Sequence, residues 1–177
     1  IHFVNDFLFG KDAFGFFEQH TLYDEWNVVK INMCKFSDLY DKDGEEAFLA
    51  QLKRTTIHEL FHYYQSEYDA RSPIKKAFSP GEENILCEAG SVWIEQFVND
   101  GQLDGNFVSQ YLPSYRKSLY NYRECWKLDS ENNKTFVKMT AAHGYGMSSL
   151  LYYMTSPISE MKGTFGIDKM EIVKLYK

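Results

Sequence analysis

Long apolar runs are missing from this chain of 177 residues. No stretch of about 18 apolar residues exists that could cross a bilayer. Basic residues are outnumbered too, because 19 Lys and Arg against 25 Asp and Glu leave a net charge of −6. That balance argues against nucleic acid or an anionic membrane as the main partner.

No signal peptide is expected in the residues given. The chain begins Ile1-His2 without Met, so we expect it to be processed or cut from a longer protein. The sequence leaves the compartment and the oligomeric state open, and slightly favours a secreted or cell-envelope protein.

Cysteine is scarce. Cys34, Cys87 and Cys125 are odd in number, lie far apart and form no Cys-x-x-Cys pair. Neither a disulfide scaffold nor a Cys-based zinc knuckle is expected from this pattern. We interpret all three as small buried hydrophobic side chains.

The residues that are present predict a mixture of strands and helices around one sizeable core. Apolar and polar residues alternate over Trp26–Phe36, which predicts a half-buried strand. Helices are predicted over about 44–68 and 82–99, over 106–128 with Pro113 as an interruption, over 139–154, and in a short terminal segment, 163–177.

The motif on which the chain centres is His58-Glu59-x-x-His62, within the first predicted helix. Residues four apart on a helix share one face, so the two imidazoles can bind one zinc ion at about 2.0–2.1 Å each. Glu59 lies beside that face, where a carboxylate can take a proton from a zinc-bound water. We expect the apolar residues of this stretch to lie on the side away from the histidines: Ile57, Leu60, Phe61 and Tyr64.

Two other interpretations of this stretch are open. One is an ordinary helix with two polar histidines on its wet face. The other is the Glu-x-x-His unit of di-iron four-helix bundles, since Glu59 and His62 have that spacing. A di-iron site needs the unit twice, and no other Glu has a His three residues later.

A catalytic zinc ion needs a third protein ligand and one open position. The second predicted helix offers Glu82, Glu83, Glu88 and Glu95. The first two lie at the helix start, where solvent and the helix dipole account for them. Glu88 is the preferred ligand because the small residues that follow it allow a close approach. Glu95, seven residues on, is the alternative ligand, or else accepts the ring proton of a ligating histidine.

The chain resembles the gluzincin metallopeptidases, in particular the peptidase MA-like and aminopeptidase-type group. The resemblance lies in the motif His-Glu-x-x-His and in Glu88, which begins the later segment Glu-Ala-Gly-Ser-Val-Trp-Ile-Glu. The resemblance extends over about 26–154. It implies zinc bound by His58, His62 and Glu88, with Glu59 activating the water that attacks a peptide bond. The segment His143-Gly-Tyr145-Gly stands where that group has a Tyr before a helix, which implies that Tyr145 hydrogen-bonds the oxyanion. His143 is the competitor for that role.

The resemblance implies one α+β, zincin-like domain over 1–177. A small mixed sheet from 1–40 would pack beside the active-site helix, and 44–177 would form a mostly helical part. The strand near Ile31 would run beside a peptide or protein substrate and pair with its backbone.

The chain departs from the family in three ways. Cys87 replaces the usual Asn, the Lys after the Tyr is absent, and the predicted strand lacks the Gly-x-Met-x-Asn that aminopeptidases use to hold a substrate amine. These departures leave endopeptidase and exopeptidase activity both open. Two other functions also stay open, a catalytically silent zincin-fold binding domain and a non-peptidase zinc hydrolase.

Overall fold

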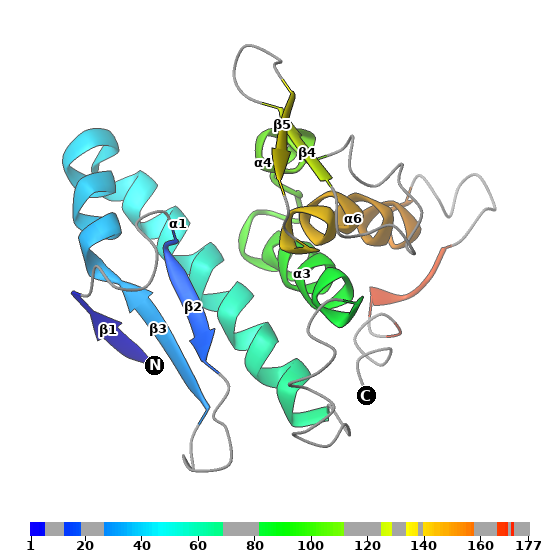
Figure 1. Ribbon diagram of the computed structural model, residues 1–177, viewed down its shortest axis with the longest axis horizontal. Helices are drawn as coiled ribbons and strands as arrows, with labels where there is room; N and C mark the ends of the chain where they lie inside the picture. Colours follow the sequence, from blue (N-terminus) through cyan, green and yellow to red (C-terminus); the bar gives the residue numbers. More distant parts are fainter. Residues whose placement is uncertain are drawn as a thin grey trace.

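The structure of this chain is a computed structural model. It describes residues 1–5, 13–18, 27–68, 82–111, 125–128, 134–137, 140–157, 166–169 and 171. For 82–84, 125–128, 134–137 and 140–142 it describes the backbone but not the side chains. The architecture is α+β, as the sequence predicts, with a three-stranded sheet at one side and packed helices at the other (Figure 1).

The sheet is small and mixed. Its strands are β1 (His2–Val4), β2 (Gly15–Glu18) and β3 (Val28–Asn32), in the order β1-β3-β2. The central strand β3 pairs in parallel with β1 and antiparallel with β2. Val29 and Ile31 point from it into a core that Phe36 completes.

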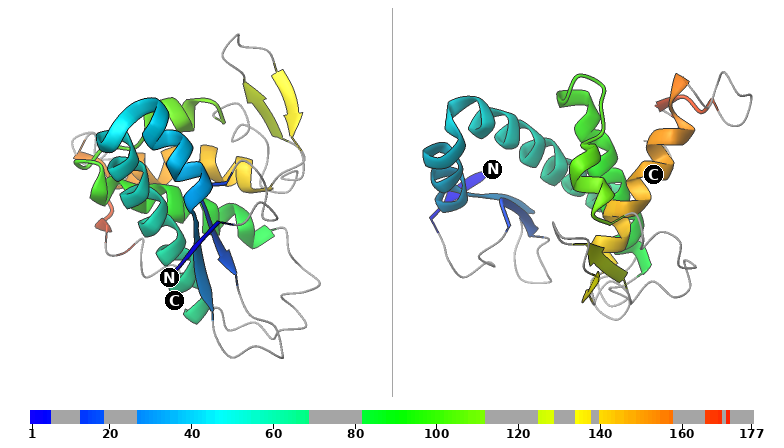
Figure 2. Two further views of the ribbon diagram at one scale, coloured as in Figure 1. Left: turned by 90° about the vertical axis from the view of Figure 1, so that its left-hand side faces the viewer. Right: turned by 90° about the horizontal axis from the view of Figure 1, so that it is seen from above.

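Helix α1 (Met33–Tyr68) follows β3 directly and breaks once, at Gly44. Gly44 has φ 85°, in the region that glycine adopts without steric cost. The long segment after this break crosses the middle of the molecule, between the sheet and the helices of the second half (Figures 1 and 2). It contacts β2 and β3 on one side and α3 on the other.

The second half of the chain is built on two helices packed against each other, α3 (Glu82–Ile94) and α6 (Thr140–Met154). A 3-10 turn, η1 (Glu95–Val98), continues α3, and a short helix, α4 (Gly105–Ser109), follows it. Trp93 is fully buried, and its indole N–H donates to Thr155 Oγ1 at 3.2 Å, which ties α3 to the end of α6. Two further strands, β4 (Cys125–Leu128) and β5 (Lys134–Val137), form an antiparallel pair.

Three predictions about these elements need correction. The predicted strand over 26–36 is too long, because β3 ends at Asn32 and a helix begins at Met33, inside the region assigned to the sheet. Asn32 Oδ1 accepts a hydrogen bond from the N–H of Lys35, as a helix N-cap does, and Phe36 on the new helix is buried against the Phe14 ring.

The second correction concerns 106–128, where a helix was predicted. The described part contains the five-residue α4 and the strand β4, whose pairing with β5 is not visible in the local pattern. The third concerns cysteine, since Cys34 and Cys87 are half-buried rather than buried. The Cys125 side chain and most of the predicted terminal helix over 163–177 lie outside the described residues.

The predicted helices at 44–68, 82–99 and 139–154 agree with the structure to within a residue or two, apart from the 3-10 geometry after Ile94. Within the described ranges, no helix is both long enough and apolar enough to cross a membrane.

Candidate metal centre

His58 and His62 lie one turn apart on α1 and turn their rings to the same side. Their Nε2 atoms are 3.2 Å apart, and the ring planes are nearly perpendicular. Both side chains are largely covered, because this stretch of α1 runs between β2 and α3. The histidine face of α1 is therefore an interior face, although it is polar.

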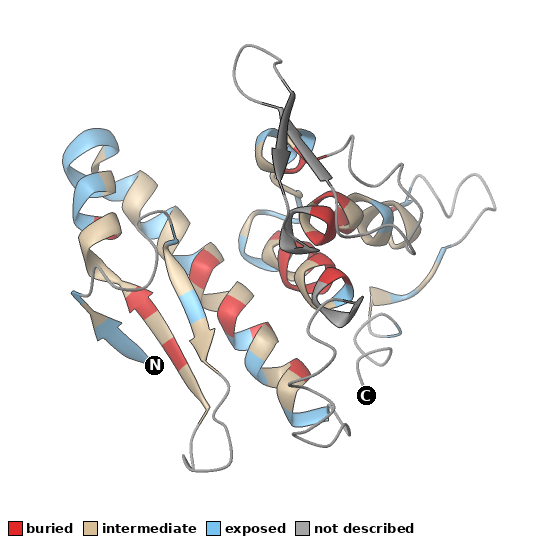
Figure 3. Ribbon diagram, viewed as in Figure 1, coloured by how far each residue is buried: buried red, intermediate tan, exposed pale blue. Residues whose placement is uncertain are grey.

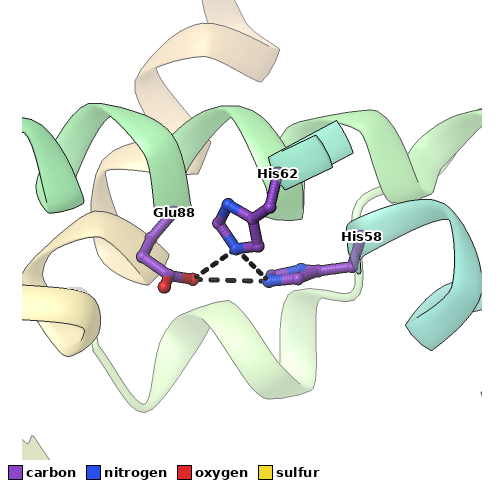
Figure 4. A group of neighbouring side chains, drawn as sticks. All are labelled: His58, His62 and Glu88. Atoms are coloured by element: carbon purple, nitrogen blue, oxygen red, sulfur yellow. Dashed lines mark hydrogen bonds and ion pairs between the residues drawn. The ribbon is translucent and has the colours of Figure 1, made fainter. Parts of the chain in front are cut away.

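Glu88 reaches the same point from α3. Its Oε2 atom is 3.3 Å from His58 Nε2 and 3.5 Å from His62 Nε2, so the three atoms form a small triangle (Figure 4). This oxygen is buried and makes no hydrogen bond of regular geometry within the described part of the chain. His58, His62 and Glu88 could together hold a metal ion.

Electrostatics couple the three side chains. Burial raises the pKa of the Glu88 carboxyl, but the two neighbouring imidazoles outweigh burial and bring it down to about 2. Burial lowers the pKa of His58, but the carboxylates of Glu88 and Glu95 outweigh it and raise the value to about 10. Glu88 is therefore ionised throughout the neutral range, as a ligating carboxylate must be.

The outward nitrogens of both rings are also engaged. Glu95 Oε1 lies 2.9 Å from His58 Nδ1, in agreement with the prediction that Glu95 accepts a histidine ring proton. His62 Nδ1 lies 3.0 Å from Gln65 Oε1 and 3.1 Å from Ser91 Oγ. Such partners fix the orientation and tautomer of a metal-ligating histidine.

Sequence reasoning missed Gln65 and Ser91. The signal was their spacing, since Gln65 follows His62 by three residues and Ser91 follows Glu88 by three. Residues three apart on a helix are neighbours on its surface.

Glu59 lies on the interior face of α1, beneath the edge of the sheet. Only 7 % of the residue is exposed, and the backbone N–H of Phe17 on β2 donates a hydrogen bond to its carboxylate. Burial raises the pKa of Glu59, against the opposing effect of His58 and His62. A carboxylate with a raised pKa takes up a proton more readily than one in water, which suits a general base.

Gly15 on β2 allows this close approach. A Cβ atom at Gly15 would lie 2.5 Å from Thr55 Cγ2 and 2.9 Å from Glu59 Cγ. The backbone of β2 thus lies directly on α1 at Glu59.

The strand that faces the candidate centre is therefore β2, not β3. The predicted pairing of a substrate with the strand near Ile31 is wrong, because β3 is the central strand and Ile31 is completely buried. Phe17 is opposite Val29 in the ladder, and its N–H points away from β3 toward Glu59. In the described sheet, β2 is an edge strand. The ring of Phe17 on this strand stacks beside the ring of His62, with centroids 6.4 Å apart.

Tyr145 and His143 lie on α6, which touches α3 at Glu88. A Cβ atom at the intervening Gly144 would lie 2.5 Å from Glu88 Cβ and 2.6 Å from the Ile85 carbonyl oxygen. The Tyr145 ring packs against Phe107 and Tyr111, each with centroids 5.2 Å away. Burial raises the pKa of the Tyr145 phenol, and so does the Glu88 carboxylate, so Tyr145 stays a neutral hydroxyl. His143 is fully buried.

Comparisons with protein-family models, with curated proteins and with solved structures find no match to this chain. The chemistry of the centre is therefore the basis for a functional assignment.

Proposed function

We propose that this chain is a zinc-dependent metallopeptidase of the gluzincin type, with a zincin-like fold. The observation that supports it is the spacing of the three converging atoms. Ligand atoms around a tetrahedral ion with bonds of about 2.0–2.1 Å are about 3.3–3.4 Å apart. His58 Nε2, His62 Nε2 and Glu88 Oε2 are separated by 3.2, 3.3 and 3.5 Å.

The donor set also favours zinc. Two imidazoles and one carboxylate are a known ligand set of catalytic zinc, which leaves a fourth position for water or substrate. His58 carries both ring protons at neutral pH beside Glu88 and Glu95, and it would release its Nε2 proton when the metal binds. A zinc ion held there supplies Lewis-acid chemistry, because it polarises a carbonyl and lowers the pKa of a water molecule to about 7.

The protein's own residues then carry the proton transfers. Glu59 takes a proton from the water molecule as the water oxygen bonds to the peptide carbonyl carbon. Glu59 passes that proton to the departing amine as the carbon–nitrogen bond breaks, which leaves a carboxylic acid and an amine. Tyr145 donates a hydrogen bond to the carbonyl oxygen while negative charge develops on it.

A peptide substrate would add to the edge of β2 that is unpaired in the described sheet, through backbone groups other than the Phe17 N–H, which donates to Glu59. Extended peptides bind to exposed sheet edges through backbone hydrogen bonds. The edge of β2 lies against Glu59 at Gly15 and Phe17, so a peptide along it would pass the base.

The decisive experiment is the metal content of purified wild-type protein beside Glu88→Ala and Glu95→Ala, together with cleavage of a peptide library. We expect about one zinc ion per chain in the wild type. Glu88→Ala should lose the metal and the activity, because it removes a ligand. Glu95→Ala should weaken metal affinity or activity by about 10- to 100-fold, because it removes the partner of His58 Nδ1.

Two outcomes would overturn the proposal in different ways. A wild-type protein that stays metal-free after dialysis against zinc contradicts the metal centre itself. A zinc-loaded protein that cleaves no peptide contradicts the peptidase assignment, and favours a silent binding domain or a zinc hydrolase with another substrate.

A further inference from the structure

Gln65 is a buried amide at the junction of the two helices that carry the converging side chains. Only 6 % of the residue is exposed. Its Oε1 atom lies 3.0 Å from His62 Nδ1, and its Nε2 atom donates to the carbonyl oxygen of Cys87 at 3.1 Å. One side chain thus contacts a histidine of α1 and the backbone of α3, one residue before Glu88.

Hydrogen-bond chemistry fixes the orientation of this amide. A backbone carbonyl can only accept, so the NH₂ group of Gln65 must face Cys87. The amide oxygen is then left for His62, and an oxygen without a hydrogen can only accept. The Gln65 amide therefore favours the tautomer of neutral His62 that carries its proton on Nδ1 and keeps a lone pair on Nε2. It acts against the Glu88 carboxylate, whose Oε2 atom lies 3.5 Å from Nε2 and favours a proton there.

Ser91 does not fix the ring in this way. Its hydroxyl lies 3.1 Å from the same Nδ1 atom, but a hydroxyl donates as readily as it accepts. Gln65 is the neighbour of His62 Nδ1 whose role is set by a second contact.

We propose that Gln65 is a positioning residue that sets the tautomer of His62 and holds α3 in register with α1. Through these two contacts, His62 and Glu88 converge before a metal binds. The consequence for metal affinity rests on the proposed zinc function. The consequence for the tautomer does not, because it follows from the contacts of Gln65 with His62 and Cys87.

Two substitutions at Gln65 separate a positioning role from simple packing. Gln65→Met keeps a side chain of similar length but removes both polar contacts. Gln65→Glu keeps an acceptor for the ring N–H of His62 and serves as the conservative rescue. Gln51→Met is the matched control, since Gln51 lies on the same helix and its amide donates to Thr55 Oγ1 at 3.2 Å, away from the histidines.

The first measurement is the tautomer of His62 in metal-free protein, from long-range ¹H–¹⁵N spectra with the ring neutral and with His62→Ala to assign the signals. Wild type, Gln51→Met and Gln65→Glu should show the proton on Nδ1. Gln65→Met should show a shift toward the Nε2-protonated form. A proton on Nε2 in the wild type would overturn the proposal, whether or not any variant folds.

The second measurement is zinc affinity by competition with a chromophoric chelator. Gln65→Met should bind zinc about 10- to 100-fold more weakly than wild type, whereas Gln51→Met should bind equally well. An unchanged affinity in Gln65→Met would overturn the role in ligand convergence. If the wild type itself binds no zinc, the proposed function fails, and the tautomer spectra still decide whether Gln65 positions His62.

Discussion

At the scale of single residues, the unusual feature is that polar residues lie at buried positions of α1, beside Phe36 and Phe61. Thr55, Glu59 and Gln65 are buried, whereas Leu60 is 43 % exposed. Of the apolar residues predicted to lie away from the histidines, Phe61 is buried and Leu60 is exposed. Burying polar groups costs free energy unless each has a partner. Here β2 supplies a partner for Glu59, α3 supplies one for Gln65, and Gln51 of α1 itself donates to Thr55. Such an arrangement is typical of a site rather than of a core.

The first prediction concerns Glu59. Glu59→Gln keeps the side-chain shape and an oxygen that can accept the Phe17 N–H, but it removes the base. We expect peptide hydrolysis to fall by at least about 10²-fold, the lower range for general acid–base catalysis. Zinc content should stay at the wild-type level. Melting temperature should stay equal or rise, because a neutral amide replaces a carboxylate that burial disfavours.

Turnover of a fluorogenic peptide, zinc content and a thermal melt on the same preparation check this prediction. A Glu59→Gln protein with the wild-type rate would exclude Glu59 as the base.

The second prediction concerns Tyr145. Tyr145→Phe removes one hydroxyl and keeps the ring between Phe107 and Tyr111. Loss of one oxyanion donor typically lowers turnover by about 10²–10³. We expect kcat to fall by that amount with KM little changed and zinc retained. If kcat does not change, the role passes to His143, and His143→Ala should then show the loss.

At the scale of elements, the site depends on how closely α6 crosses α3. Gly144 on α6 lies directly against Glu88 and Ile85 on α3, and a side chain at position 144 would have no room there. In Figure 3 the buried positions of both helices gather where they meet. The close crossing places Tyr145 one residue from the contact with Glu88, so helix packing and site geometry are linked.

The third prediction tests this crossing. Gly144→Ala adds a methyl group that would lie 2.6 Å from a backbone oxygen, so α6 must shift. Overpacking of this kind typically costs about 1–3 kcal/mol. We expect a lower free energy of unfolding in urea and weaker zinc binding, although alanine is the better helix former by about 1 kcal/mol.

Gly105→Ala on α4 is the control, because nothing lies within 4 Å of the added methyl group. It should leave both quantities near their wild-type values. Equal stability of the two variants would show that α6 does not need the glycine.

At the scale of the whole molecule, the candidate centre lies across the boundary between the N-terminal and C-terminal parts. α1 contributes His58 and His62 from beside the sheet, and α3 contributes Glu88 from the helical half (Figure 1). A metal ion bound there would crosslink the two parts, and it would bind only the folded chain.

The fourth prediction follows from that placement. A ligand that binds only the folded state at 100 times its Kd stabilises it by about 2.7 kcal/mol. For a chain of this length, that corresponds to a rise in melting temperature of about 5–10 °C. We expect zinc to raise the melting temperature of metal-free protein by this amount and EDTA to reverse it. His58→Ala should show no rise, and an equal rise in that variant would contradict binding at this centre.

What the sequence determined by itself is local. The four-residue spacing of His58 and His62 places both on one helix face. The helical period predicts helices over 82–99 and 139–154, within a residue of α3 with η1 and of α6. The seven-residue spacing of Glu88 and Glu95 placed both toward α1, one near each ring nitrogen of His58. Helix periodicity acts over a few residues, so it can be recognised without tertiary structure.

What only the tertiary structure decided involves partners far apart in the chain. The hydrogen bond from Phe17 to Glu59, the bridge from Gln65 to Cys87 and the contact of Gly144 with Glu88 join separate elements. Which strand faces the centre follows from the order β1-β3-β2, and that order is set by pairing across the sheet. Such contacts depend on how complete helices and strands pack, and a pattern within one segment carries no information about its neighbours in space.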